Sequence, residues 1–293
     1  MRDRFGWNMT NKVSVLLLAL TTAAMAQSPA PAPGESQLRT RQLWDTTLLE
    51  KRPAASKAAP KAAISHGLVK GALVGVTVWR LRPSKSTDDT SVRSLVHEES
   101  GDQEYTPERI SSRTPLLEGQ RVRISAESAQ AGYMYVIDRD EYMDGSKGDP
   151  YLIFPTQRTR GGDNKVVPGK VIEIPAQTDT PPFFKVTRSR ADQVNETLTF
   201  LITPKPLEEL QIGRNRLKLT EAQVAAWEKQ WKTKSYKLED IATEGKAYTA
   251  AEKAAARGEK LLTNQDPVPQ TMYRVDCKKG EPVMLDLQLR IAK

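Results

Sequence analysis

Beyond residue 70, hydrophobic residues fall into short runs in which every second position is apolar. The clearest run is the last, where the apolar positions are Val283, Leu285, Leu287, Leu289 and Ile291. A period of two is typical of a β-strand that buries one face. Comparable runs bounded by Gly, Pro or Asp predict strands at residues 75–82, 119–126, 132–137, 151–154, 171–174, 183–186 and 196–202. This series predicts a mainly β chain, folded as an antiparallel, immunoglobulin-like β-sandwich over residues 70–216 and 264–293.

Residues 84–114 interrupt this pattern with a stretch rich in Ser, Thr, Asp and Glu, which predicts a long mobile loop. One of the two histidines, His97, lies in this stretch, and the other, His66, lies in a Pro/Ala-rich segment. Neither histidine occurs at the spacing of a metal site or a hydrolase motif. The sequence therefore gives no support to a histidine-based active site.

Residues 217–263 have the features of helices rather than strands. Thr220–Gln223 and Thr249–Glu252 both have the capping-box spacing that marks the start of a helix. Trp227 and Trp231 follow the first of these starts at helical spacing. We expect a small helical insertion that the two tryptophans anchor to the sandwich. The alternative is that they form a platform for a ligand.

The chain begins with a basic segment, followed by the apolar run Val13–Ala24 and by small residues up to Ala26. This order is typical of a signal peptide over residues 1–26, with cleavage after Ala26. The apolar run has about a dozen residues, whereas a helix that crosses a bilayer needs roughly 20. We therefore expect a periplasmic or secreted protein without a transmembrane segment.

Residues 27–69 form a Pro/Ala-rich linker, which we predict to be a disordered tether. Within it, the segment Leu38–Lys51 contains Trp44 and several leucines and could form a short amphipathic helix. Trp and Leu in such an arm are typical of segments that bind a partner, so Trp44 is a candidate binding residue. The alternative is a helix that rests on its own domain.

The sequence contains a single cysteine, Cys277, which excludes an internal disulfide. The end of the signal peptide lacks the cysteine that a bacterial lipoprotein needs, so we expect no lipid anchor. Cys277 follows an alternating stretch that places it on the same face as Tyr273 and Val275. This placement favours a buried, inert thiol.

The formal net charge of +8 favours anionic partners. Arg158, Arg160, Lys165 and Lys170 form the most basic stretch and are candidate binding residues for an anionic surface. Aromatic residues do not alternate with these bases, so we expect no binding of nucleic acid. Because acidic residues are interspersed, the alternative interpretation is an ordinary solvated surface.

No serine-hydrolase elbow, phosphate-binding loop or zinc motif occurs in the sequence, and we expect neither a catalytic residue nor a cofactor. Among the closely spaced carboxylates that follow residue 137, Asp138, Asp140 and Asp144 are candidate calcium ligands, because calcium prefers oxygen donors. Their spacing departs from that of an EF-hand. The plainer interpretation is a hairpin whose turn is Asp144–Gly145.

The segment from Leu116 to Leu207 resembles the bacterial domain of unknown function 4384 family. The matching residues are, in order, Leu117–Gly119, Arg121–Ile124, Gly132–Ile137, Leu152–Pro155, Pro168–Gly169, Ile172–Pro175 and Leu198–Ile202. The resemblance covers about a third of the chain and rests on the order of these pieces. It implies an exported or envelope-associated accessory module. Members are often attached to protease-like or kinase-like domains, and this chain shows no such domain.

Three hypotheses about function follow from these observations. The leading one is a non-catalytic module of the bacterial cell envelope that binds a protein or another envelope component. The second is an envelope hydrolase that uses the carboxylates of Asp138–Asp149. The third is a structural or assembly subunit that docks through Leu38–Lys51.

Overall fold

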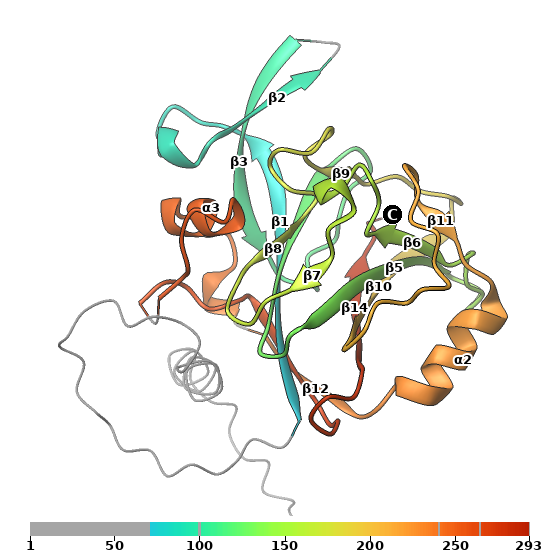
Figure 1. Ribbon diagram of the computed structural model, residues 1–293. Coiled ribbons are helices and arrows are strands. Elements are labelled where there is room, and N and C mark those ends of the chain that lie inside the picture. Colours follow the sequence, from blue (N-terminus) through green and yellow to red (C-terminus); the bar gives the residue numbers. More distant parts are fainter. Residues whose placement is uncertain (1–70, 99–100, 240, 264, 293) are drawn as a thin grey trace, which may run out of the picture. The chain divides into compact units, whose positions relative to one another are not determined.

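The computed structural model describes residues 71–98, 101–239, 241–263 and 265–292. The predictions for the signal peptide at 1–26 and the linker at 27–69 lie outside these residues, as do Ala26 and Trp44. The described residues form two antiparallel β-sheets, with short helices packed on their outer faces (Figure 1).

Eight of the described strands form one sheet, which we call the first sheet. Its main path is β12 (Ser235–Glu239), β13 (Thr271–Val275), β1 (Ala72–Pro83), β3 (Gly101–Ile110) and β2 (Ser94–Glu98). Off this path, β4 (Arg121–Ser128) pairs with β1 and also with β8 (Ile172–Ile174) and β9 (Phe184–Lys185).

The second sheet contains six of the described strands. Its main path is β11 (Leu217–Lys218), β6 (Tyr151–Phe154), β5 (Gly132–Tyr142), β10 (Gln193–Thr203) and β14 (Val283–Arg290). The short strand β7 (Lys165–Val166) pairs with β5. Short 3₁₀ turns lie at Thr90–Val92, Arg160–Gly162 and Ile241–Thr243.

Strand β1 holds the first sheet together because three strands pair with it. On one edge, β13 pairs with the first half of β1, with Ala72 opposite Val275, and β3 pairs with the second half. On the other edge, β4 runs along both halves. At the change of partner, the backbone N–H of Gln270 donates to the hydroxyl of Thr77 at 3.0 Å. The Thr77 side chain thus supplies a hydrogen bond at the position of β1 that lies between the part paired with β13 and the part paired with β3.

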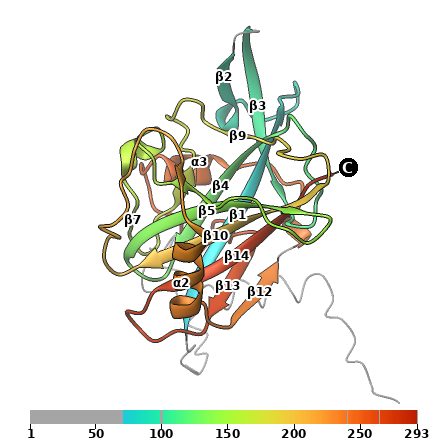
Figure 2. The same cartoon turned by 90° about the vertical axis from the view of Figure 1, so that its right-hand side faces the viewer.

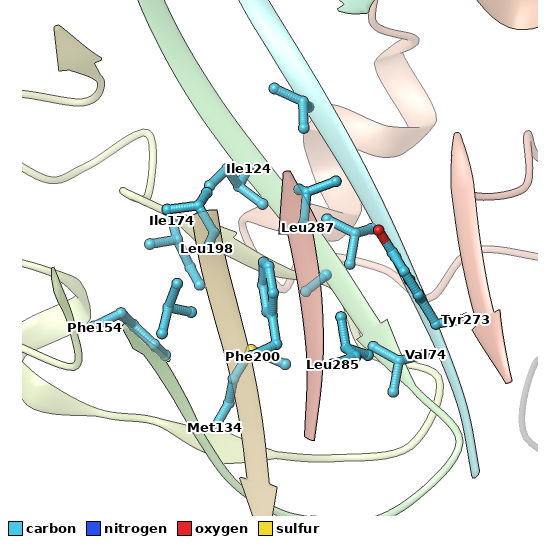
Figure 3. Packing of buried hydrophobic residues seen from close by; sticks show 14 of the residues in the cluster. Val74, Ile124, Met134, Phe154, Ile174, Leu198, Phe200, Tyr273, Leu285 and Leu287 are labelled. Carbon is cyan, nitrogen blue, oxygen red and sulfur yellow. The ribbon is translucent and has the colours of Figure 1, made fainter. Parts of the chain in front are cut away.

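Between the sheets lies a core built from alternate positions of facing strands (Figure 3). Phe200 of β10 and Leu285 of β14 meet Val74 and Ile124 from the first sheet. The neighbour of Leu285, Met284, belongs to a separate cluster on the outer face of the second sheet. The alternation read from the last strand and the antiparallel β-sandwich are therefore confirmed.

Helix α2 (Glu221–Trp231) covers the outer face of the second sheet (Figure 2). It begins after Thr220, whose hydroxyl accepts a hydrogen bond from the backbone N–H of Gln223 at 3.1 Å. Trp227 is buried against this face. The ring of Trp231 stacks on the ring of Trp227, with the two centroids 6.0 Å apart. The prediction that the two tryptophans anchor the helix is confirmed.

Helix α3 (Ala250–Ala256) lies beside the first sheet (Figure 1), and it begins with the complete capping box that the sequence predicts. The carboxylate of Glu252 closes this box and also forms a buried ion pair with Arg109 of β3. Just before the helix, the ring of Tyr248 packs edge-on against Trp79 of β1, with centroids 4.6 Å apart. Both contacts fix α3 to the sheet.

Residues 217–263 are therefore not a single helical unit, although they contain the two predicted helices. The helices pack against different sheets, and β12 between them pairs with β13 at the edge of the first sheet. In β12, Tyr236 and Leu238 alternate with polar residues, but the run has only five residues and is mostly exposed, so it is not predicted as a strand from the sequence. This segment crosses from the second sheet to the first.

The prediction of a long loop at residues 84–114 is wrong. Strands β2 and β3 form an antiparallel hairpin that belongs to the first sheet and extends beyond its other strands (Figures 1 and 2). Polar residues in this region pair with each other: Glu108 binds Arg80 and Arg82 of β1, and Arg82 also binds Asp88 at 2.7 Å. Only a few apolar residues, including Val96 and Tyr105, are buried here among these charged pairs, so the composition resembles that of a loop.

Candidate functional site

The inner face of the second sheet changes from apolar to acidic toward one end. Because side chains alternate along a strand, β5 continues from Val136 to Asp138 and Asp140 on this face. In the same way, β10 continues from Leu198 to Glu196. The register places Leu198 opposite Asp138 and Glu196 opposite Asp140. Three carboxylates therefore adjoin where the apolar core ends.

These carboxylates lie in a cleft of about 770 Å³. Tyr151 of β6 lines one side, and the segment from Pro175 to Ser189 contributes Phe183 and Phe184 on another. Residues 214–216 complete the lining. A volume of this size is typical of sites that bind small molecules or short segments of a polymer.

Asp138 and Glu196 form a carboxyl–carboxyl hydrogen bond inside the cleft. A carboxylate has no proton to donate, so this bond requires that one of the two groups is protonated. Burial raises the pKa of Asp138 to about 6; the hydrogen bond with Glu196 opposes this effect and the charge of Asp140 adds to it. Burial, followed by the charge of Asp138, raises the pKa of Glu196 well above its ordinary value. Both shifts favour the protonated form, so the pair retains a shared proton in solutions where isolated carboxyl groups are ionised.

Basic side chains lie around these acids. Asp138, Asp140 and Glu196 are half-buried, whereas the basic lining residues are exposed: Arg158, Lys185, Arg214 and Arg216. The guanidinium of Arg216 lies 4.0 Å from the centroid of the Tyr151 ring. The cleft thus combines an acidic floor with a basic rim.

The structure separates the three carboxylates proposed as calcium ligands. Asp138 and Asp140 belong to strand β5 rather than to the loop after it, and both line the cleft. Asp144 lies in the predicted turn with Gly145, where it accepts from the backbone N–H of Ser146 at 2.8 Å and pairs with Arg190. The described residues contain no group of three or more His, Cys, Asp or Glu side chains placed to hold a metal ion.

The four predicted basic residues do not form one surface. Arg158 lies at the rim of the cleft, whereas Arg160, Lys165 and Lys170 line a separate groove. The remaining predicted binding residue, Trp44, is outside the described part of the chain. The basic stretch in the sequence thus divides between two sites.

Glu196 is an acidic site residue that is not predicted from the sequence, and Arg214 and Arg216 are basic ones. The sequence predicts strand β10 from Leu198, Phe200 and Ile202, which share one face. Glu196 occupies the next position of that face, where a charged residue replaces an apolar one. An acidic residue at a position that the period of two assigns to the buried face is the sequence signal that identifies Glu196.

The thiol of Cys277 is partly buried and packs against the core. Burial raises its pKa, which disfavours the reactive thiolate. This agrees with the predicted inert thiol.

Comparison with known proteins identifies no relative: no family model, no curated protein and no solved structure matches the chain. The resemblance to the domain of unknown function 4384 family therefore stays a prediction. Within the described residues, no helix has both the length and the apolar character needed to span a membrane.

Proposed function

We propose that the chain is an exported, ligand-binding module of the bacterial cell envelope, and that its ligand occupies the cleft above Asp138 and Glu196. The hydrogen-bonded acid pair carries this proposal. Acidic side chains at the end of a β-sandwich core cost stability, and groups with perturbed pKa values inside a cleft are typical of functional sites. The signal-peptide pattern at residues 1–26 supports the envelope as the compartment.

The chemistry of the lining indicates the class of ligand. The acidic floor accepts hydrogen bonds from ammonium or hydroxyl groups, while the guanidinium groups of Arg214 and Arg216 donate to carboxylates. The rings of Phe183 and Phe184 offer apolar surface between them. A ligand that carries both amines and carboxylates fits this arrangement, and the peptide portion of bacterial cell wall has that composition.

Calorimetric titration of the full chain with soluble cell-wall fragments, released by a muramidase, tests the proposal. The double variant Asp138→Asn, Glu196→Gln preserves the shape of the pair but removes its negative charge. We expect its affinity to fall by tenfold or more, because a hydrogen bond to a charged group contributes about 1.5–3 kcal/mol. Asp144→Asn removes a carboxylate outside the cleft and serves as the control. Equal affinity of the double variant and the control contradicts the proposal.

The shared proton favours hydrolysis as a second candidate function. Two carboxyl groups in hydrogen-bond contact are closer than the roughly 5 Å separation of glycosidase pairs, and they resemble acid dyads that activate water. Asp138 takes a proton from water as the water oxygen bonds to an amide carbon, and Glu196 gives its proton to the carbonyl oxygen. As the C–N bond breaks, Glu196 regains its proton from a hydroxyl and Asp138 protonates the leaving amine.

Mass spectrometry of the same fragments after incubation separates the two functions. Hydrolysis predicts a mass gain of one water per cleaved bond, and it predicts that Asp138→Asn abolishes this product. Fragments that bind but keep their masses support binding alone and exclude hydrolysis of that substrate.

A further inference from the structure

A second groove, of about 220 Å³, lies away from the cleft and shares no lining residue with it. One wall comes from the segment 160–172, between β6 and β8, and the other comes from the end of α3 and residues 257–260. Segments that are far apart in the sequence therefore meet here. The first wall carries three of the bases that the sequence predicts to bind an anionic surface, and the second wall adds Arg257 and Lys260.

Positive charge dominates this groove. Its charged lining residues are five bases and a single acid: Arg160, Lys165, Lys170, Arg257, Lys260 and Asp163. Asp163 is already engaged, since it pairs with Arg160 at 3.4 Å and accepts from the backbone N–H of Lys165 at 3.0 Å. Among the described residues, Lys165, Lys170 and Lys260 have no ion-pair partner in the structure. Three ammonium groups thus remain available to an anion.

The backbone of the first wall contains three consecutive residues with positive φ. Arg160 has φ of 52°, and it is the one non-glycine residue with positive φ in the described chain. Gly161 and Gly162 follow with φ of 62° and 88°. A left-handed backbone is unfavourable for arginine, and such strain concentrates at binding sites. The turn is held by the backbone N–H of Arg160, which donates to the carboxylate of Asp179 at 3.0 Å.

Apolar side chains form the rest of the lining, including Val167, Val171 and Ala255. A ligand that fits has a compact, multiply charged group for the bases and a carbon skeleton for these side chains. Phosphate meets the first requirement better than carboxylate, because it has more oxygens, which accept from several cations at once, and a monoester carries a higher charge.

We propose that this groove binds the phosphate group of an organic phosphate. The basic lining of the groove favours an anionic group, whereas the acidic floor of the cleft favours an ammonium or hydroxyl group. The phosphate can belong to a soluble monoester, which carries up to two negative charges, or to a phospholipid headgroup, whose diester carries one; both present phosphate oxygens to the bases.

Two binding experiments on the full chain distinguish the sources. Calorimetry with glycerol 3-phosphate reports the soluble ester, and sedimentation with phosphatidylcholine vesicles, with and without phosphatidylglycerol, reports the headgroup. The triple variant Lys165→Gln, Lys170→Gln, Lys260→Gln removes the three unpaired cations. The control Lys246→Gln, Lys279→Gln, Lys229→Gln removes the same charge from exposed positions outside the groove.

We expect the groove variant to lose roughly tenfold in affinity, since three exposed ion pairs contribute about 0.5 kcal/mol each. The control should change by less than twofold. Binding of glycerol 3-phosphate that the groove variant weakens supports the site with a soluble ligand, and selective loss of vesicle binding supports it with a lipid. Absence of both kinds of binding, or equal losses in the two variants, overturns the proposal.

Discussion

The raised pKa of Asp138 predicts an unusual dependence of stability on pH. An ordinary aspartate has a pKa of 3.8, and in the folded chain the pKa of Asp138 is about 6. Between these values the folded state binds more protons than the unfolded state, so the free energy of unfolding falls as pH rises. Ionisation of Asp138 therefore lowers the free energy of unfolding, and this loss develops between about pH 4 and just above pH 6. The raised pKa of Glu196 acts in the same direction.

The size of the effect follows from the difference between the two pKa values. A difference of about two pH units corresponds to about 3 kcal/mol at most, at 1.36 kcal/mol per unit. Replacement of Asp138 by Asn removes this titration and keeps an amide that can hydrogen-bond with Glu196. The variant should match the wild type near pH 4 and exceed its stability by up to about 3 kcal/mol at pH 8.

Urea denaturation at pH values from 4 to 8 measures this difference, provided that the dependence on urea concentration is equal in both proteins. Asp144→Asn is the matched control, because hydrogen bonds from Ser146 lower the pKa of that exposed carboxyl group. The lowered pKa of Asp144 stabilises the folded state at pH values above its ordinary pKa of 3.8, and this stabilisation is lost only as the pH falls below that value. Parallel pH profiles for the wild type and Asp138→Asn would refute the assigned burial of this carboxylate.

Three further substitutions test the packing, each measured by equilibrium denaturation. Glu252→Leu leaves the buried guanidinium of Arg109 without its partner and should cost about 3–5 kcal/mol; a cost below 1 kcal/mol would mean that water reaches this pair. Trp227→Ala removes the anchor of α2 and should cost about 3–5 kcal/mol, with loss of the near-ultraviolet signal of stacked indoles; an unchanged signal contradicts the stacking. Gly132→Ala places a methyl group 2.4 Å from the carbonyl oxygen of Thr203 and should destabilise by about 1–3 kcal/mol, whereas an unchanged midpoint rejects this close approach.

The sandwich was predictable because most of its strands bury one apolar face. Leu285 and Phe200 lie in runs whose period matches the pleat, and proline ends several neighbouring runs. The hairpin β2–β3 gives a weaker signal, since its buried Val96 and Tyr105 stand among charged residues such as Glu108, which arginines of β1 hold. Pairing between residues distant in the sequence decides this element, and local composition does not contain that information.

The candidate site was predictable only in part. The sequence indicates Asp138 and Asp140 as members of a carboxylate cluster, but it places them in a loop because other acidic residues and a glycine follow closely. The strand extends through Tyr142 because β10 pairs with it along its whole length. Glu196 joins Asp138 through this pairing, which no local spacing reveals. The basic groove likewise depends on α3 meeting a segment about 90 residues earlier in the chain.

The pairing of β1 with β13 has a consequence for how the chain acquires its fold. β1 is the first described strand, yet half of one edge remains without a partner until Val275 is available to lie opposite Ala72. Contacts of such long sequence separation form late and slowly, because closing a long loop costs entropy before the contact repays it. The first sheet therefore cannot be completed until nearly the whole chain is available for folding, since the partner of the first half of β1 lies about 200 residues further along the sequence.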